Sequence, residues 1–538
     1  MNDLYIRMAT ENRSRRRRAI ANSIRMHSLP SPRCLLPLAT ALVLTTAARA
    51  DVKLPAIISD HMVLQAETPA TVWGWADAGE KVTVKFANKS AETVAGPEGR
   101  WSVKLPELKA GTAGELAIEG KNALAIKDVV VGEVWVCSGQ SNMEWRVAGA
   151  ANPTEEAEAA KFPLIRMFTV QKTPKLEPQE DCTGKWEVCS PQTAPAFSAV
   201  GYYFGRKIHQ ALNQPVGLVH TSWGGTPAEF WTPQPVIARD PAFAPIIDAW
   251  EKKKAAYPEA KAKFDEAMAK WREASKAATD AGEKPPTPPR EPQGGGAFGA
   301  PACLYNGMIA PIVPYTIRGA IWYQGESNAG QARLYRKLFP TMILSWRRAW
   351  GDEFPFLFVQ LANYNPRKLP KDGEPQESQW AELREAQAMT LELPRTGMAV
   401  AIDIGEPNDI HPKNKQEVGR RLALAAEATV YYRDQEFSGP LFAGAQAEEG
   451  KMRLSFRHSD GLKSKEGGKL KGFAVAGADK KFVWANAVID GDHIVVSSPE
   501  VPEPVAVRYA WADDPECNLV NATGLPASPF RSDDWQQR

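Results

Sequence analysis

Hydrophobic and polar positions alternate in short stretches over the part of the chain that follows residue 50. Residues 71–75 and 82–86 show this pattern, and Gly, Asp and Asn separate such stretches from one another. Alternation with a period of two is typical of half-buried β-strands joined by turns. The pattern therefore predicts a small all-β domain over residues 51–128.

From about residue 129 the pattern changes to apolar strands that alternate with amphipathic helices. The apolar runs predicted as strands are 129–137, 216–221, 319–323, 356–361 and 398–404. The amphipathic segments predicted as helices are 199–212, 334–350, 377–391 and 413–430. This alternation is typical of a parallel sheet with helices on both faces. Residues 129–435 are expected to form an α/β domain that binds its ligand at the carboxyl ends of the strands.

An insertion at 240–300 interrupts the alternation. Residues 240–280 are rich in Lys, Glu and Ala with aromatic residues at helical spacing, and 285–296 are rich in Pro and Gly. We interpret the segment as a helix packed on the outside of the domain, in preference to a partner-binding arm. Short strands with turns return after 435, so residues 436–538 are predicted to form a second β domain.

Length and composition fit this division into domains. The chain has 538 residues, which is more than a single hydrophobic core normally serves. Its 43% hydrophobic and 24% charged residues exclude a fibrous, disordered or multispan membrane protein. The net charge of +2 depends on nine arginines within residues 1–50; residues 51–538 carry 56 basic and 61 acidic side chains. This mildly acidic remainder gives no reason to expect nucleic-acid binding.

The first fifty residues have the order of a secretory signal. Arginines at 13–18 precede an apolar run from Cys34 to Thr46, and Ala48-Arg49-Ala50 forms a small-residue cleavage site. A membrane anchor is the alternative, but the run is shorter than the ~20 residues that span a bilayer. We expect a periplasmic or secreted protein that begins at Asp51 and has no integral membrane segment.

Export to an oxidising compartment permits disulfide bonds. Five cysteines remain after residue 50, an odd number, so at least one of them lacks a partner within the chain. Cys182 and Cys189 flank a short loop and are the expected pair.

The most informative motif is Ser-Gly-Gln-Ser-Asn at 138–142, between an apolar strand and a predicted helix. Ser141 would stand in a tight strand-to-helix turn at the carboxyl edge of the sheet, where helix-start amides also point. That position suits a nucleophile whose attack creates an oxyanion. The alternative is that Ser141 only caps the helix.

A serine nucleophile needs a base, and His411 has the most suitable context. It follows the last apolar strand of the α/β region and precedes an amphipathic helix, so it is expected at the same edge as Ser141. Nearby acids, among them Asp409 and Asp403, are close enough in sequence to orient its imidazole. A solvated surface loop is the alternative for this segment.

Two more polar loops leave the same edge. Gly224 and Gly225 follow one strand, and their backbone amides are candidates for contact with an acyl oxygen. Residues 324–328 follow another strand and contribute the polar side chains of Gln324, Glu326 and Asn328. Together with Gln140, these residues are candidates for the oxyanion hole and for substrate binding. Tryptophans in or beside the loops are expected either to stack on sugar rings or to pack in the core: Trp145, Trp223, Trp231 and Trp322.

Several blocks of the chain resemble the sialate O-acetylesterases, a family of the SGNH superfamily of serine hydrolases. These blocks are 61–65, 139–143, 224–229, 304–308, 322–328, 410–412 with Lys415, and 529–535. The resemblance implies an SGNH, flavodoxin-like three-layer domain with a parallel sheet, flanked by β-sandwich or jelly-roll-like domains. It also implies a metal-free and cofactor-free esterase that removes O-acetyl groups from sugars, with Ser141 as nucleophile and His411 as base.

The chain departs from the superfamily at the acid. Asn408 stands three residues before the histidine, where an Asp is usual, so Asp409, Asp403 or a backbone carbonyl is left to orient His411; we favour Asp409. The substrate is expected to be an acetylated sialic acid or a hemicellulose such as xylan. A non-catalytic glycan-binding protein and an SGNH lipase or thioesterase are the alternatives. The sequence leaves the oligomeric state open.

Overall fold

The computed structural model describes residues 51–365 and 374–535. The predicted signal sequence at 1–50 lies outside these residues. By their contacts, the described residues form one compact unit. No helix within the described ranges is both long enough and apolar enough to cross a membrane.

A parallel sheet forms the centre of the α/β region. Its strand order is β13-β12-β11-β7-β10-β8-β9, parallel except for β9. The strands are β7 (Ala123–Gly139), β8 (Ile165–Thr169), β9 (Trp186–Val188), β10 (Val216–Ser222), β11 (Gly319–Tyr323), β12 (Phe356–Gln360) and β13 (Thr396–Val400). The predicted α/β fold is confirmed, and each of the five predicted strands is present with small shifts at its ends.

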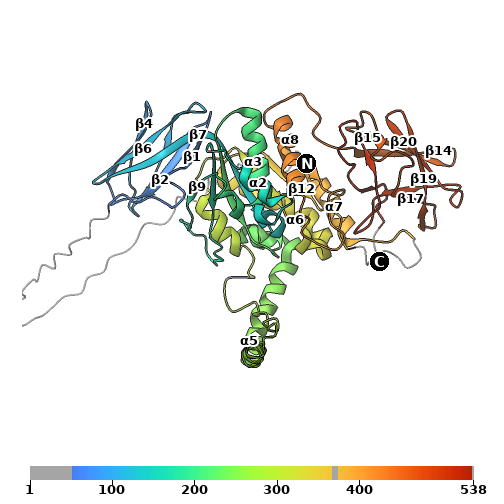
Figure 1. Cartoon of the computed structure of the whole chain (residues 1–538), viewed down its shortest axis with the longest axis horizontal. Helices are drawn as coiled ribbons and strands as arrows, with labels where there is room; N and C mark the ends of the chain where they lie inside the picture. The colour runs from blue at the N-terminus through green and yellow to red at the C-terminus, as the bar shows by residue number, and fades with distance from the viewer. Residues whose placement is uncertain (1–50, 366–373, 536–538) are drawn as a thin grey trace, which may run out of the picture. The chain divides into compact units, whose positions relative to one another are not determined.

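The strand order reverses at β7, which lies between β10 and β11. Right-handed crossovers then place the helices that lead to β10 and to β12 on opposite faces of the sheet. Helix α3 (Ala199–Leu212) packs against α8 (Lys415–Thr429), whereas α6 (Ala332–Trp350) packs against α7 (Gln379–Met389) (Figure 1). In such a fold, the ligand binds at the carboxyl end of the strand where the order reverses, here β7.

The N-terminal strands are continuous with this sheet through β7. Strand β1 (Val63–Gln65) pairs with β7 in parallel, and β6 (Ala113–Glu119) pairs with it in the antiparallel sense. Strands β3 (Lys81–Phe86) and β4 (Lys89–Val94) extend this part, and β2 (Ala70–Trp75) pairs with β5 (Arg100–Leu105). The expected domain boundary at 128/129 therefore falls inside a strand, and one hydrophobic core spans both sides of it.

The C-terminal residues form separate antiparallel sheets with their own hydrophobic core. One sheet has the order β14 (Leu441–Glu448), β15 (Lys451–Arg457), β20 (His493–Ser497) and β19 (Asn486–Asp490). Another has the order β18 (Phe482–Trp484), β17 (Phe473–Ala476), β21 (Ala506–Tyr509) and β23 (Phe530–Arg531), and β16 (Lys463–Ser464) pairs with β22 (Leu519–Val520).

Buried Arg384 of α7 joins the C-terminal strands to the central sheet. Its guanidinium donates to the carbonyl oxygens of Leu361 and Ala362, just beyond β12, and to those of Ala512 and Asp513. Each of these hydrogen bonds is 2.7–2.9 Å long. One side chain thereby satisfies carbonyls on both sides of this junction.

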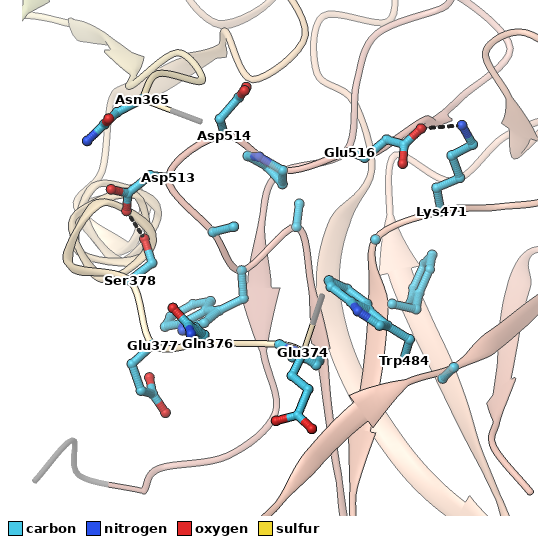
Figure 2. A pocket seen from close by; sticks show the side chains of 18 of the residues that line it. Asn365, Glu374, Gln376, Glu377, Ser378, Lys471, Trp484, Asp513, Asp514 and Glu516 are labelled. Carbon is cyan, nitrogen blue, oxygen red and sulfur yellow. Dashed lines mark hydrogen bonds and ion pairs between the residues drawn. The ribbon is translucent and has the colours of Figure 1, made fainter. Parts of the chain in front are cut away.

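A cavity of about 1380 Å³ lies beside the start of α7 and the C-terminal strands (Figure 2). Ser378 donates to Asp513 at 2.5 Å, and Lys471 pairs with Glu516 at the opposite side. Ser141 and His411 are not among the residues that line this cavity.

The inserted segment contains α5 (Ala244–Asp280), of which only Ile246 is buried. Lys–Glu and Lys–Asp pairs four residues apart, such as Lys263 with Glu259, stabilise its exposed surface.

The expected disulfide between Cys182 and Cys189 is wrong. Both cysteines have free thiols. Cys189 is buried, and its sulfur contacts the carbonyl oxygen of Ala160 at 3.8 Å. Cys189 directly follows β9, and its backbone N–H donates to the carbonyl oxygen of Ile165 at 3.0 Å.

Candidate active site

Ser141 lies at the turn between β7 and the short helix α1 (Ser141–Glu144). The turn depends on Gly139, whose φ is +139°, and a Cβ at this position would lie 2.2 Å from the carbonyl oxygen of Tyr323. Gln140 then donates its backbone N–H to that same carbonyl at 2.9 Å. The close approach of β7 to the end of β11 thus brings Ser141 to the reversal point of the strand order.

His411 contacts Ser141 directly. Its Nε2 lies 2.8 Å from the Ser141 Oγ, so the hydroxyl can donate to the neutral imidazole. The indole of Trp145 stacks on the imidazole with ring centroids 4.9 Å apart and an angle of 15° between the planes. The structure therefore brings together the two residues that the sequence predicts as nucleophile and base, and Trp145 covers one face of the base.

The acid partner is less tightly arranged. Asp409 Oδ1 lies 3.8 Å from His411 Nδ1, and it accepts the backbone N–H of His411 at 2.9 Å instead. Asp403, the other candidate, pairs with Arg421 at 2.6 Å. A separation of 3.8 Å is too long for a hydrogen bond, so Asp409 acts on the imidazole as a nearby charge and holds its backbone. The preference for Asp409 stays a prediction.

The electrostatic surroundings favour a neutral imidazole. Burial lowers the pKa of His411 below its usual value, and the ammonium of Lys415 lowers it further, whereas Asp409 raises it. A neutral imidazole is the form that accepts a proton from a hydroxyl.

The glycine loop after β10 lies against the nucleophile. A Cβ at Gly224 would be 3.2 Å from the Cβ of Ser141. The Gly224 backbone N–H, however, donates to Glu144 Oε2 at 2.7 Å, and Glu144 also pairs with Lys172 at 2.6 Å. Gly224 is therefore a fixed point of the loop and its N–H is not available to an oxyanion.

Two other backbone amides remain. In the described part of the chain, the N–H groups of Ser141 and Gly225 have no hydrogen-bond partner. Gly225 is exposed and has a φ of +72°, a conformation that favours glycine. These two amides are the candidates for the oxyanion hole.

The side-chain amides of Gln324 and Asn328, predicted as candidates for the oxyanion hole, form hydrogen bonds within the protein. Gln324 donates to Asn328 Oδ1 at 2.7 Å and accepts from the Tyr335 hydroxyl at 3.0 Å. Asn328 donates to Glu229 at 3.0 Å and accepts from the backbone N–H of Ala228 at 2.9 Å. Both side chains are buried, and their hydrogen bonds hold the loop after β11 against its neighbours.

Gln140 and Glu326 also make internal contacts. Gln140 Oε1 accepts the backbone N–H of Ser327 at 3.2 Å. Glu326 Oε1 accepts from the Asn142 amide at 2.6 Å, and burial raises the pKa of this carboxyl group. Both residues thus join the loops that follow β7 and β11.

The tryptophans divide between core and site. Trp231 and Trp322 are fully buried and pack edge to face, so of the two alternatives that the sequence left open, packing in the core applies to them. Trp223 is partly exposed, with the Lys172 ammonium 5.2 Å from its ring centroid. Trp145 stacks on His411, and Trp223 directly precedes Gly224 in the glycine loop.

Three residues that complete the site are not among the candidates singled out from the sequence: Glu144, Lys172 and Asn142. Asn142 ends the Ser141 motif and Glu144 lies two residues beyond it, but their partners are distant in sequence: Glu326 is 184 residues from Asn142, and Gly224 and Lys172 are 80 and 28 residues from Glu144. Within residues 51–365 and 374–535, no three His, Cys, Asp or Glu side chains are grouped as a metal site would require.

Comparison with known proteins shows the family of the chain. A family model described as carbohydrate esterase, sialic acid-specific acetylesterase, matches residues 131–279 and 298–428. A carbohydrate acetylesterase from Xanthomonas citri has a solved structure with a TM-score of 0.75 and 38% identity, covering 90% of this chain and 100% of its own. Sialate O-acetylesterase of Rattus norvegicus is 31% identical over 88% of this chain and 93% of its own length. Sialate O-acetylesterase of Homo sapiens is 28% identical over 93% and 96%.

The fold and these similarities define an α/β carboxylic ester hydrolase of the SGNH type. Within this class, the chain belongs to the carbohydrate esterase family of sialic acid-specific acetylesterases.

Proposed function

We propose that the protein removes O-acetyl groups from carbohydrates through an acetyl-serine intermediate on Ser141. The observation that carries this proposal is the 2.8 Å contact between Ser141 Oγ and His411 Nε2 at the carboxyl end of β7. A serine hydroxyl is a weak nucleophile unless a base within hydrogen-bond distance accepts its proton. Family membership supports the acetylated sugar as substrate.

The reaction then follows from the positions of the groups. Ser141 Oγ attacks the acetyl carbonyl while its proton passes to His411 Nε2, and negative charge develops on the carbonyl oxygen. The N–H groups of Ser141 and Gly225 donate to this oxygen. His411 returns the proton to the sugar oxygen as the ester bond breaks. A water molecule then attacks the acetyl-serine while His411 takes its proton; the bond to Ser141 Oγ breaks, acetate leaves, and His411 returns the proton to Ser141 Oγ.

The sugar is proposed to be an acetylated sialic acid or an acetylated hemicellulose, encountered in the periplasm or outside the cell. The names of the animal relatives support the first sugar, and that of the Xanthomonas citri enzyme supports carbohydrates in general. Parallel assays of acetate release from O-acetylated sialic acid and from acetylated xylan would distinguish the two.

Exchange of the nucleophile tests the proposed function. Ser141→Ala should reduce hydrolysis of an aryl acetate to near the uncatalysed rate, whereas Ser327→Ala, which truncates an exposed serine in a neighbouring loop, should retain it. Retention of most of the wild-type rate by Ser141→Ala would contradict the proposal.

A further inference from the structure

Lys415 is a buried cation directly behind the Ser141–His411 pair. It is the first residue of α8, four positions after His411, and its side chain has no exposed surface. Its Nζ lies 5.7 Å from the ring centroid of Tyr323 and 5.9 Å from that of Trp145. Burial of an ammonium group is costly, so a lysine enclosed in this way requires specific partners.

Asn142 provides the direct partner. Lys415 Nζ donates to Asn142 Oδ1, and Asn142 follows the nucleophile in the chain. The Asn142 amide nitrogen in turn donates to the Ile410 carbonyl at 3.0 Å and to Glu326 Oε1 at 2.6 Å. Asn142 thus links Lys415 to the residue before His411 and to the loop after β11.

The carboxyl group of Glu326 lies on the other side of Asn142. Its Oε1 is held by Asn142, whereas Oε2 is buried without a hydrogen-bond partner. Burial lowers the pKa of Lys415 to about 7, and the carboxylates of Glu326, Asp409 and Glu406 act against this decrease. The Asn142 amide therefore lies between a buried ammonium and a buried carboxylate.

We infer that Lys415 is a positioning residue for the esterase reaction: with Asn142 and Glu326, it holds the helix start that carries Ser141 against the loop that carries His411. The inference rests on the proposed function. Trp145 extends the arrangement, because one indole is close to the ammonium of Lys415 and stacks on the imidazole of His411. A hydrophobic side chain at position 415 could not form the hydrogen bond to Asn142 and would therefore leave the nucleophile and the His411 loop unlinked at this point.

Two effects follow from the position of Lys415. Its charge opposes a second charge on His411, so it keeps the base neutral; Asp409 acts in the opposite direction. Its hydrogen bond to Asn142 fixes the separation of nucleophile and base, on which proton transfer depends. Loss of Lys415 should therefore reduce kcat and raise the pH at which activity is half-maximal.

The test compares Lys415→Met with Lys413→Met, which removes an exposed lysine two residues away. On an aryl acetate, Lys415→Met should reduce kcat at least about tenfold with KM changed less than about threefold, and its acid limb should move to higher pH. Lys413→Met should retain the wild-type kcat and pH profile. An unchanged kcat and pH profile in folded Lys415→Met would overturn the inference.

A second variant keeps the inference testable if Lys415→Met does not fold. Asn142→Ala retains the buried lysine but removes its link to Ile410 and Glu326, so it should also reduce kcat at least about tenfold. Wild-type kcat in Asn142→Ala would overturn the positioning role. Ser141→Ala separates the two claims. If that variant retains activity, the proposed function fails and the inference fails with it; if it is inactive while Lys415→Met and Asn142→Ala keep the wild-type kcat, the inference alone fails.

Discussion

At the scale of single residues, the ionisation of His411 controls the reaction. The base must be neutral to accept the Ser141 proton, and burial together with Lys415 lowers its pKa. A lower pKa keeps the imidazole neutral at more acidic pH, so activity should be half-maximal below about pH 6.5, the ordinary value for histidine. Measurement of kcat/KM against pH on a neutral aryl acetate tests this; a midpoint above that value would contradict it.

Asp409 should affect the same profile in the opposite sense. Its carboxylate raises the pKa of His411 from a distance of 3.8 Å, so Asp409→Asn should move the acid limb to lower pH. The loss in kcat should be about tenfold, well below the roughly 10⁴-fold loss expected for a fully hydrogen-bonded triad acid. A 10⁴-fold loss, measured under the same conditions, would show that Asp409 bonds the imidazole during the reaction.

At the scale of elements, the turn between β7 and α1 is the most constrained part of the site. Gly139 combines a φ of +139° with a backbone oxygen 2.2 Å from any added Cβ. Gly139→Ala should lower the free energy of unfolding by about 3 kcal/mol or more and reduce esterase activity. Gly296→Ala, at an open position without positive φ, is the control. Equal denaturant midpoints for the two variants would argue against this strain.

The positions of Ser141, His411 and the glycine loop could be predicted because each follows an apolar run that forms a parallel strand. Carboxyl ends of such strands meet at one edge, whatever the details of packing. The inward direction of Gln324 and Asn328 could not be predicted, since it depends on Tyr335, Glu229 and other distant partners. The burial of Lys415 likewise could not be predicted, since it depends on the distant residues Asn142, Trp145 and Tyr323.

Strand β8 (Ile165–Thr169) is not among the strands that the hydrophobic pattern predicts, for a related reason. Its sequence contains Arg166, which interrupts the apolar pattern. The arginine is nevertheless buried, because Asp128 accepts from its guanidinium at 3.1 Å and at a second, shorter contact. A charged residue can occupy an interior strand when its partner is supplied from elsewhere in the chain.

At the scale of the whole molecule, two hydrophobic cores are joined through polar contacts. Arg384 donates to carbonyl oxygens on both sides of the junction. Arg384→Met leaves the carbonyl oxygens of Leu361 and Ala512 without a donor, whereas those of Ala362 and Asp513 still accept from Trp380 and Tyr364. The change should lower the free energy of unfolding by about 3 kcal/mol. Calorimetry should then show the C-terminal strands unfolding before the central sheet, whereas Arg272→Met on exposed α5 should leave the transition unchanged. A single unaltered transition in Arg384→Met would contradict this role.

The length of the acyl chain that the enzyme accepts distinguishes the proposed function from its alternatives. The proposed function requires acetate esters to be preferred over octanoate esters, whereas a lipase or thioesterase would accept the longer chain. Comparison of kcat/KM for aryl acetate and aryl octanoate tests this preference. Equal or faster hydrolysis of the octanoate would favour the lipase or thioesterase alternative.

The formation of an acetyl-enzyme is the most direct test of the central claim. Rapid quenching of the wild type with an aryl acetate, followed by mass spectrometry, should show one added acetyl group on the peptide that contains Ser141. The Ser141→Ala variant should show none. Turnover without an acetylated Ser141 peptide, or acetylation at another residue that keeps pace with turnover, would contradict the assignment of Ser141 as the nucleophile.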